Sequence, residues 1–109
     1  MKTTLVRYTT HADRAGENEA LIHAVFDELR RVAPTGFRYG AFKQADGASF
    51  VHFAMMDNAD GSNPLVQLES FKRFQSDLNE RCVELPVVTH LATLVDAYGM
   101  APVTEAPVG

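Results

Sequence analysis

A histidine and a tyrosine on neighbouring predicted strands are the side chains best suited to chemistry in this sequence. His52 lies in the middle of one strand, and Tyr39 and Ala41 lie on the strand before it. In a pocket between a sheet and helices, such a histidine could act as a base or as a hydrogen-bond donor. It could equally be structural, bonded to its neighbours or placed at a subunit interface. We predict His52 as the catalytic residue and Tyr39 as a substrate-binding neighbour, with the structural role as the alternative.

Two further residues are candidates for binding a substrate. His90 lies in the last predicted strand, and Arg7 lies in the middle of the first, where an unpaired cation is costly. Arg7 could therefore bind an acidic group. Its alternative is an ion pair with an acid such as Asp96, or a stem that reaches the sheet edge. His11 and His23 are predicted to be solvated and are assigned no role.

The sequence predicts neither a metal site nor a nucleotide cofactor. The histidines lie on separate predicted elements, and Cys82 has no CxxC or HxxxH companion. The loop 58–61 resembles part of a calcium loop, but Met56 and Gln67 occupy its first and last ligand positions. No GxGxxG motif or P-loop occurs. Cys82 has no neighbouring base in the sequence, so a core role is preferred over a nucleophilic one.

Six segments must position these residues. Alternating apolar residues predict strands, and apolar residues at helical spacing predict helices, most clearly Leu21, Ile22, Val25 and Leu29. Asp13 is a plausible N-cap of the first helix, and Pro34 and Gly36 follow its end. The predicted order is strand 4–11, helix 14–32, strand 37–44, strand 49–56, helix 68–82 and strand 87–95.

The two middle strands are predicted to form a hairpin. Asp46-Gly47 favours a tight turn, and with these two as the turn residues Ala41 faces His52 and Tyr39 faces Ala54. Both faces of the hairpin are then largely apolar, because Phe37, Phe50 and Met56 lie on one and Phe42, Val51, Phe53 and Met55 on the other. The pattern leaves open which face meets the helices.

An apolar sheet face is expected to remain uncovered in a single copy. Two helices with one apolar stripe each can cover only one face of a four-stranded sheet. The other face would expose a large apolar surface. Packing of a second copy about a twofold axis would bury it, so we predict a homodimer.

Composition limits the remaining classes. The chain has 109 residues, 46% hydrophobic and 22% charged, with a net charge of −4, which predicts one folded domain at residues 1–99 and argues against nucleic-acid binding. Residues 100–109, with Pro102 and Pro107, are predicted to be a flexible C-terminal tail. A single cysteine, no Asn-Xaa-Ser/Thr acceptor and no signal-like or membrane-length apolar run predict a cytoplasmic protein with no membrane association.

The same elements resemble the dimeric α/β-barrel superfamily, and within it the antibiotic-biosynthesis-monooxygenase-like domains. The resemblance covers about residues 4–95. It is carried by Leu5-Val6-Arg7-Tyr8, the helix around Glu19-Ala20-Leu21, the hairpin 37–56, and Leu68-Glu69-Ser70-Phe71-Lys72-Arg73-Phe74, which is similar to the family's leucine-serine-phenylalanine pattern. It implies a ferredoxin-like α+β fold of order βαββαβ, with a four-stranded antiparallel sheet, two helices on one face and a dimeric α/β barrel.

The resemblance also implies a class of function. Members include cofactor-free oxygenases of quinol-like aromatics, haem-degrading enzymes and proteins of no assigned activity. It implies a small-molecule-binding protein, a cofactor-independent monooxygenase of an aromatic or quinol-like substrate. Two alternatives remain, a non-catalytic dimeric module and a haem-binding protein with His52 or His90 as ligand. The chain lacks the tryptophan of the oxygenase and haem-degrading members, and residues 63–67 lack a histidine often found there, so those roles are not carried over.

Overall fold

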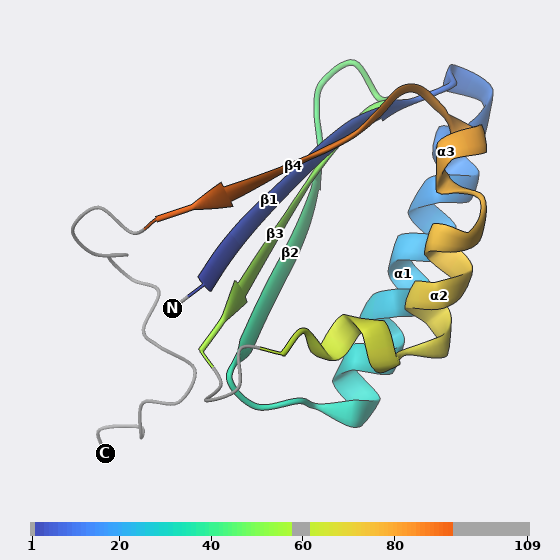
Figure 1. Ribbon diagram of the computed structural model, residues 1–109. Helices are drawn as coiled ribbons and strands as arrows, with labels where there is room; N and C mark the ends of the chain where they lie inside the picture. Colours follow the sequence, from blue (N-terminus) through green and yellow to red (C-terminus); the bar gives the residue numbers. More distant parts are fainter. Residues whose placement is uncertain (1, 58–61, 93–109) are drawn as a thin grey trace.

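Four strands form one antiparallel sheet, and the helices pack against one of its faces (Figure 1). The structure, a computed structural model, describes residues 2–57 and 62–92. The strands stand in the spatial order β2-β3-β1-β4. In chain order the elements are β1 (Lys2–Thr10), η1 (Ala12–Arg14), α1 (Ala15–Val32), β2 (Phe37–Lys43), β3 (Ser49–Met56), η2 (Pro64–Gln67), α2 (Glu69–Ser76), α3 (Leu78–Arg81) and β4 (Cys82–Leu91), where η marks a 3₁₀ helix.

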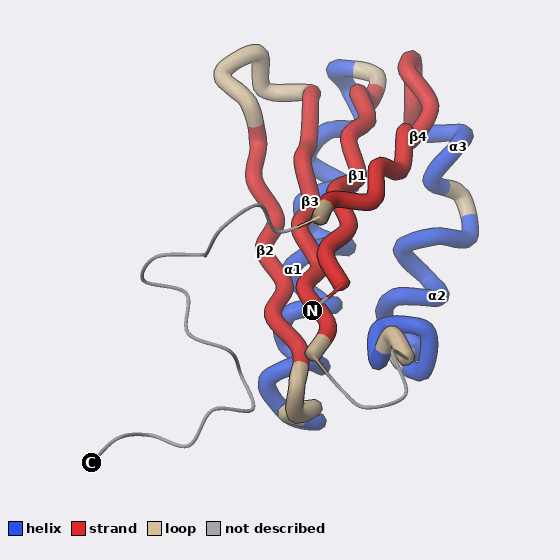
Figure 2. The backbone as a smooth tube through the Cα atoms, turned by 60° about the vertical axis from the view of Figure 1, so that its left-hand side comes forward, coloured by secondary structure: helices blue, strands red, loops and turns tan. Residues whose placement is uncertain are grey.

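The predicted ferredoxin-like α+β fold is confirmed. β1 lies inside the sheet, because it pairs with β3 on one side and with β4 on the other. β2 and β4 form the two edges. Figure 2 shows α1 behind the middle of the sheet and α2 and α3 towards the β4 edge.

The predicted hairpin register is also confirmed. Tyr39 pairs with Ala54 and Ala41 with His52. The Asp46 carboxylate accepts the backbone N–H groups of Ala48 and Ser49 at 3.0 and 2.8 Å, which closes the turn locally. Gly47 has a φ of 77°, a conformation that favours glycine.

The structure decides which sheet face meets the helices. The face with Tyr39 and His52 also carries Tyr8, and it packs against Val25 of α1 and Phe74 of α2. Tyr8 and Val25 are each 2% exposed, so this layer is the core of the domain.

The start of the first helix differs from the prediction, whereas its end agrees with it. A 3₁₀ turn, η1, precedes α1, so the helix begins at Ala15 and Asp13 lies before it; no side chain caps its N-terminus. At the other end Ala33 adopts a left-handed conformation with a φ of 49°, and Pro34 follows, which ends the helix as predicted.

The boundaries predicted for the last third of the chain were wrong. The predicted helix 68–82 is divided into α2 and α3 at Asp77, and the last strand begins at Cys82 rather than at residue 87. Pro86 was expected to precede the strand but lies inside it. It is tolerated because β4 is an edge strand and its register against β1 shifts between Arg7 and Thr9, which is where Pro86 lies.

Parts of the earlier predictions fall outside the described residues. The flexible tail at 100–109 and the acid Asp96, expected to pair with Arg7, are among them. Within residues 2–57 and 62–92, no helix is long and apolar enough to cross a membrane.

Candidate active site

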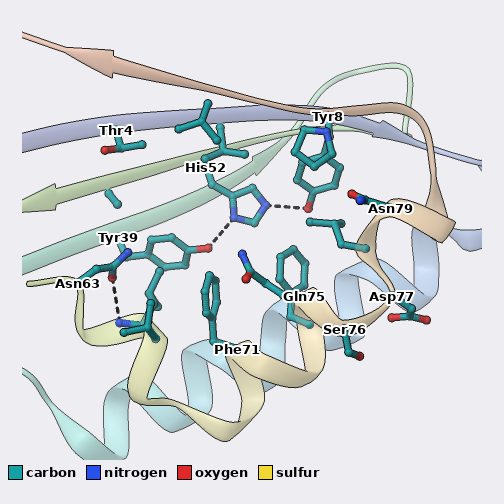
Figure 3. A pocket seen from close by; sticks show the side chains of 18 of the residues that line it. Thr4, Tyr8, Tyr39, His52, Asn63, Phe71, Gln75, Ser76, Asp77 and Asn79 are labelled. Carbon is teal, nitrogen blue, oxygen red and sulfur yellow. Dashed lines mark hydrogen bonds between the residues drawn. The ribbon is translucent and has the colours of Figure 1, made fainter.

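A cleft of about 730 Å³ lies between the inner face of the sheet and the segment from η2 to α3 (Figure 3). We call it the sheet–helix cleft. Its apolar walls include Val6 and Val88 from the sheet and Leu65 and Phe71 from the helices. Tyr39, His52 and Tyr8 contribute polar atoms on the sheet side. A mostly apolar hollow with a few converging polar groups is typical of small-molecule sites.

His52 is held between two tyrosines. Its Nδ1 lies 2.6 Å from the hydroxyl of Tyr39, and its Nε2 lies 2.8 Å from the hydroxyl of Tyr8 (Figure 3). The Phe74 ring, 5.7 Å away between centroids, packs beside the imidazole. His52 is only 5% exposed. The three side chains come from three adjacent strands, β2, β3 and β1. They lie together because the strand register puts them on one face of the sheet.

Burial determines the protonation of this group. Desolvation lowers the pKa of His52 to about 4, so the imidazole is neutral near pH 7. Desolvation also raises the pKa of Tyr8 and of Tyr39 well above the ordinary tyrosine value, so both hydroxyls keep their protons. The cluster is therefore uncharged, and it is better suited to donating and accepting hydrogen bonds than to strong base catalysis.

The hydrogen bonds continue from Tyr8 into the interior. Asn18 of α1 donates from Nδ2 to the Tyr8 hydroxyl at 2.8 Å, and its Oδ1 accepts the Nε–H of Arg81 at 3.0 Å. Asn18 and Arg81 are both 0% exposed. We refer to Arg81, Asn18, Tyr8, His52 and Tyr39 as the Arg81–Tyr39 network.

Arg81 is a fully buried cation with several bonds of its own. Its Nη2 donates to the Phe74 carbonyl at 2.7 Å, and its Nη1 is bonded to the Asp77 carboxylate. The guanidinium also lies 5.2 Å from the centre of the Phe74 ring. Asp77 in turn contacts Arg14 of η1 at 3.3 Å. These bonds connect α3 with α2, α1 and η1.

Of the predicted site residues, the structure brings only Tyr39 and His52 together at the cleft. Arg7 is exposed. Because side chains alternate along β1, Arg7 shares a face with Thr9 and lies on the opposite face of the sheet from Tyr8. His90 is exposed on β4, with its Nδ1 3.4 Å from the Thr4 hydroxyl, and it is not among the residues that line the cleft.

Sequence reasoning missed Asn18 and Arg81. Both occupy positions in phase with apolar residues, Asn18 with Val25 on α1 and Arg81 with Phe74 and Leu78 before β4. A polar residue at a helical position that otherwise carries apolar residues is the sequence signal that could have identified them. It is weak, because the same pattern occurs where a side chain simply extends to the solvent.

The described residues offer little for a metal or for haem. Among them, no three histidine, cysteine or acidic side chains gather as a ligand set. Both nitrogens of His52 are engaged by tyrosines, so axial ligation by His52 would break a buried hydrogen bond. Cys82 is buried, and burial raises the pKa of its thiol, which disfavours the reactive thiolate.

Comparison with known proteins identifies the fold. No protein-family model matches the sequence, and no curated protein shows significant similarity to it. The structure is similar to Rv0793 from Mycobacterium tuberculosis, with a TM-score of 0.72 and 23% identity over 88% of this chain and 97% of that one. It is also similar to an antibiotic biosynthesis monooxygenase, with a TM-score of 0.73 and 14% identity over 87% of this chain and 100% of that one.

A third solved structure has a described chemistry. SnoaB from Streptomyces nogalater, a cofactor-independent oxygenase, is similar with a TM-score of 0.62 and 18% identity, over 91% of this chain and 97% of that one. At these identities the similarity shows the fold and leaves the activity open. The chain therefore has the ferredoxin-like fold of the antibiotic-biosynthesis-monooxygenase-like proteins.

Proposed function

We propose that this chain binds an aromatic or quinol-like small molecule in the sheet–helix cleft and oxygenates it without a cofactor. The observation that carries the proposal is the buried, neutral His52 bonded to Tyr39 at 2.6 Å on the wall of a cleft of about 730 Å³. Support also comes from the fold, which this chain shares with a cofactor-independent oxygenase.

The proposed reaction uses electrons from the substrate itself. Loss of a proton from a ring CH₂ group that is conjugated with a carbonyl, as in an anthrone, gives a delocalised anion, which passes electrons to O₂. Oxidation of CH₂ to C=O supplies four electrons; one oxygen atom becomes the new carbonyl, and the other leaves as water with both hydrogens. The protein must therefore stabilise negative charge on the substrate oxygen within an apolar site. Tyr39, oriented by His52, is placed to do so.

Replacing Tyr39 with phenylalanine tests this proposal. The change removes one hydroxyl from the cleft wall and keeps the ring, which stacks on Phe26 with 5.2 Å between centroids. We expect wild-type protein to consume O₂ with at least one member of a panel of quinols and anthrones. In Tyr39→Phe, kcat/KM should fall by about a hundredfold, the effect of removing one donor to a developing oxyanion. Oxygen uptake, corrected for autoxidation, measures both.

A control variant and the other outcomes of the panel make the result specific. Thr35→Val removes an exposed hydroxyl from the loop before β2 and should leave the rate unchanged. A wild-type protein that neither consumes O₂ nor shows a ligand-induced rise in Tm with the panel would contradict the proposal and favour the non-catalytic module. Haem belongs in the same panel, and a Soret band with a raised Tm would favour the haem-binding alternative.

A homodimer is the second part of the proposal. β4 exposes apolar side chains on both of its faces: Val83, Leu85, Val87 and Val88 are 56–63% exposed. Strands that are apolar on both faces are usually covered on both. The outer face of the sheet also carries exposed Phe42 on β2, together with Arg7 and Glu84, charges of both signs. Such a surface can be self-complementary, so a second copy is the occupant we propose.

Replacing Val87 with lysine tests the homodimer. Val87 is 63% exposed on β4, so the change costs the single chain little, but it places a cation in the proposed interface. We expect wild-type protein to have twice the mass of one chain in light scattering and Val87→Lys to shift to a single-chain mass. Val32→Lys, at a residue 52% exposed at the end of α1, should stay dimeric. A monomeric wild-type protein at micromolar concentration would contradict the proposal.

A further inference from the structure

We propose that Arg81 and Asn18 set the direction of every hydrogen bond in the Arg81–Tyr39 network. As a result, His52 carries its proton on Nδ1, and the Tyr39 hydroxyl faces the sheet–helix cleft as a donor. The cleft then selects aromatic ligands that present an acceptor, a carbonyl or phenolate oxygen. The part of this proposal that concerns ligands rests on the proposed function, which places the ligand in the cleft. The part that concerns the tautomer of His52 does not.

The direction begins at a group that can only donate. A guanidinium has N–H donors and no acceptor. Arg81 Nε therefore donates to Asn18, and the atom it meets at 3.0 Å must be the amide oxygen. This assigns the Asn18 side chain without ambiguity, because its NH₂ group must then point to the Tyr8 hydroxyl 2.8 Å away.

The direction of the next bond, between Tyr8 and His52, follows from the number of protons. The Tyr8 oxygen accepts from Asn18, so its own O–H needs an acceptor. Among the described residues the remaining partner of this hydroxyl is His52 Nε2, at 2.8 Å. The opposite tautomer would direct both the Asn18 N–H and an Nε2–H at one oxygen. It would leave the O–H of Tyr8, a residue 2% exposed, without an acceptor, which is costly in the interior.

The last bond reaches the cleft. A neutral imidazole has one N–H, so when Nε2 accepts, Nδ1 donates to the Tyr39 oxygen 2.6 Å away. Burial lowers the pKa of His52 to about 4, which keeps the ring neutral. The Tyr39 O–H is then not used within the network. Because Tyr39 lines the cleft, this proton is the one presented to a ligand (Figure 3).

Asn18 is thus a positioning residue, and one isosteric substitution should reverse the network. In Asn18→Asp the carboxylate accepts from Arg81, which keeps it ionised, and it can only accept from Tyr8. Tyr8 must then donate to it, His52 must donate from Nε2 to Tyr8, and Nδ1 must accept from Tyr39. The Tyr39 oxygen would face the cleft as an acceptor.

The first measurement is the ¹⁵N spectrum of histidine side chains in the ligand-free protein. We expect His52 in the wild type to show Nδ1 as a protonated nitrogen and Nε2 as an unprotonated one, and Asn18→Asp to exchange the two. Gln44→Glu, which adds the same charge at an exposed position after β2 and away from the cleft, should resemble the wild type. A wild-type His52 protonated on Nε2 would overturn the inference even if the variant fails to fold, and so would a tautomer unchanged in folded Asn18→Asp.

The second measurement compares two planar probes, 9-fluorenone with a carbonyl acceptor and carbazole with an N–H donor at the matching position. Their fluorescence can be followed because the chain has no tryptophan. We expect the wild type to prefer 9-fluorenone, and the ratio of the two Kd values to shift at least about fivefold towards carbazole in Asn18→Asp. An unchanged ratio would overturn the selection of acceptors. If the tautomers are as expected and neither probe binds, the network direction is supported and the proposed function fails.

Discussion

Replacing Arg81 with methionine is expected to lower the free energy of unfolding by about 3–5 kcal/mol. The methionine side chain fills the space of the arginine stem but donates nothing. The Asn18 amide oxygen and the Phe74 carbonyl would lose their donors in the interior, and Asp77 would lose its closest cation. Urea unfolding followed by circular dichroism measures the difference.

The same substitution at an exposed arginine is the control. Arg73 lies on the exposed side of α2, so Arg73→Met should change the unfolding free energy by less than about 0.5 kcal/mol. An Arg81→Met variant as stable as Arg73→Met would show that the buried cation is no better than an apolar side chain here. Such an outcome is known for some buried ion pairs, which well-packed hydrophobic residues can replace.

Acidification is expected to destabilise the protein by about 2 kcal/mol between pH 7 and pH 4.5, through His52 alone. In the unfolded chain this histidine takes up a proton near its ordinary pKa of 6.5, whereas burial holds the pKa at about 4 in the folded protein. The unfolded state therefore binds more protons between these values. Stability is fully present above pH 6.5 and is lost as the pH falls towards 4.

His52→Gln isolates this effect, because glutamine can donate and accept hydrogen bonds but does not titrate. Its unfolding free energy should be lower at pH 7 and should vary less down to pH 4.5. His23→Gln, at an exposed position of α1, should keep the wild-type dependence. The range ends at pH 4.5 because hydrogen bonds lower the pKa of Glu28 and of Asp46, whose protonation adds to the loss below it. Equal pH slopes for wild type and His52→Gln would contradict a neutral, buried His52.

The two proposals about function and the stability predictions depend on the same few side chains. Tyr39 lines the sheet–helix cleft, whereas Asn18 and Arg81 are fully buried. Substitutions at the buried end are therefore expected to change both stability and ligand preference, whereas Tyr39→Phe is expected to lower the rate and, through the lost bond to His52, to have a smaller effect on stability. Measuring unfolding and binding on the same variants separates these effects.

The sequence by itself determined the fold and the local geometry of the site pair. Alternating apolar residues and the Asp46-Gly47 turn determine the hairpin register. The strand neighbours of Tyr39 and His52 could therefore be predicted from the sequence alone. This works because strand pairing is periodic and the turn is stabilised by nearby groups, here Asp46 bonded to Ala48 and Ser49. The homodimer also rests on the sequence pattern and remains a prediction.

Tertiary structure alone decided which face of the sheet became the interior and which polar residues were buried there. Both faces of the hairpin are apolar, so the pattern could not choose between them, and Arg7 lies on the face away from the cleft. The break at Asp77 and the burial of Asn18 and Arg81 depend on bonds between residues 63 positions apart in the chain. Local sequence periodicity cannot predict such contacts, because they form only when α1 and α3 pack together.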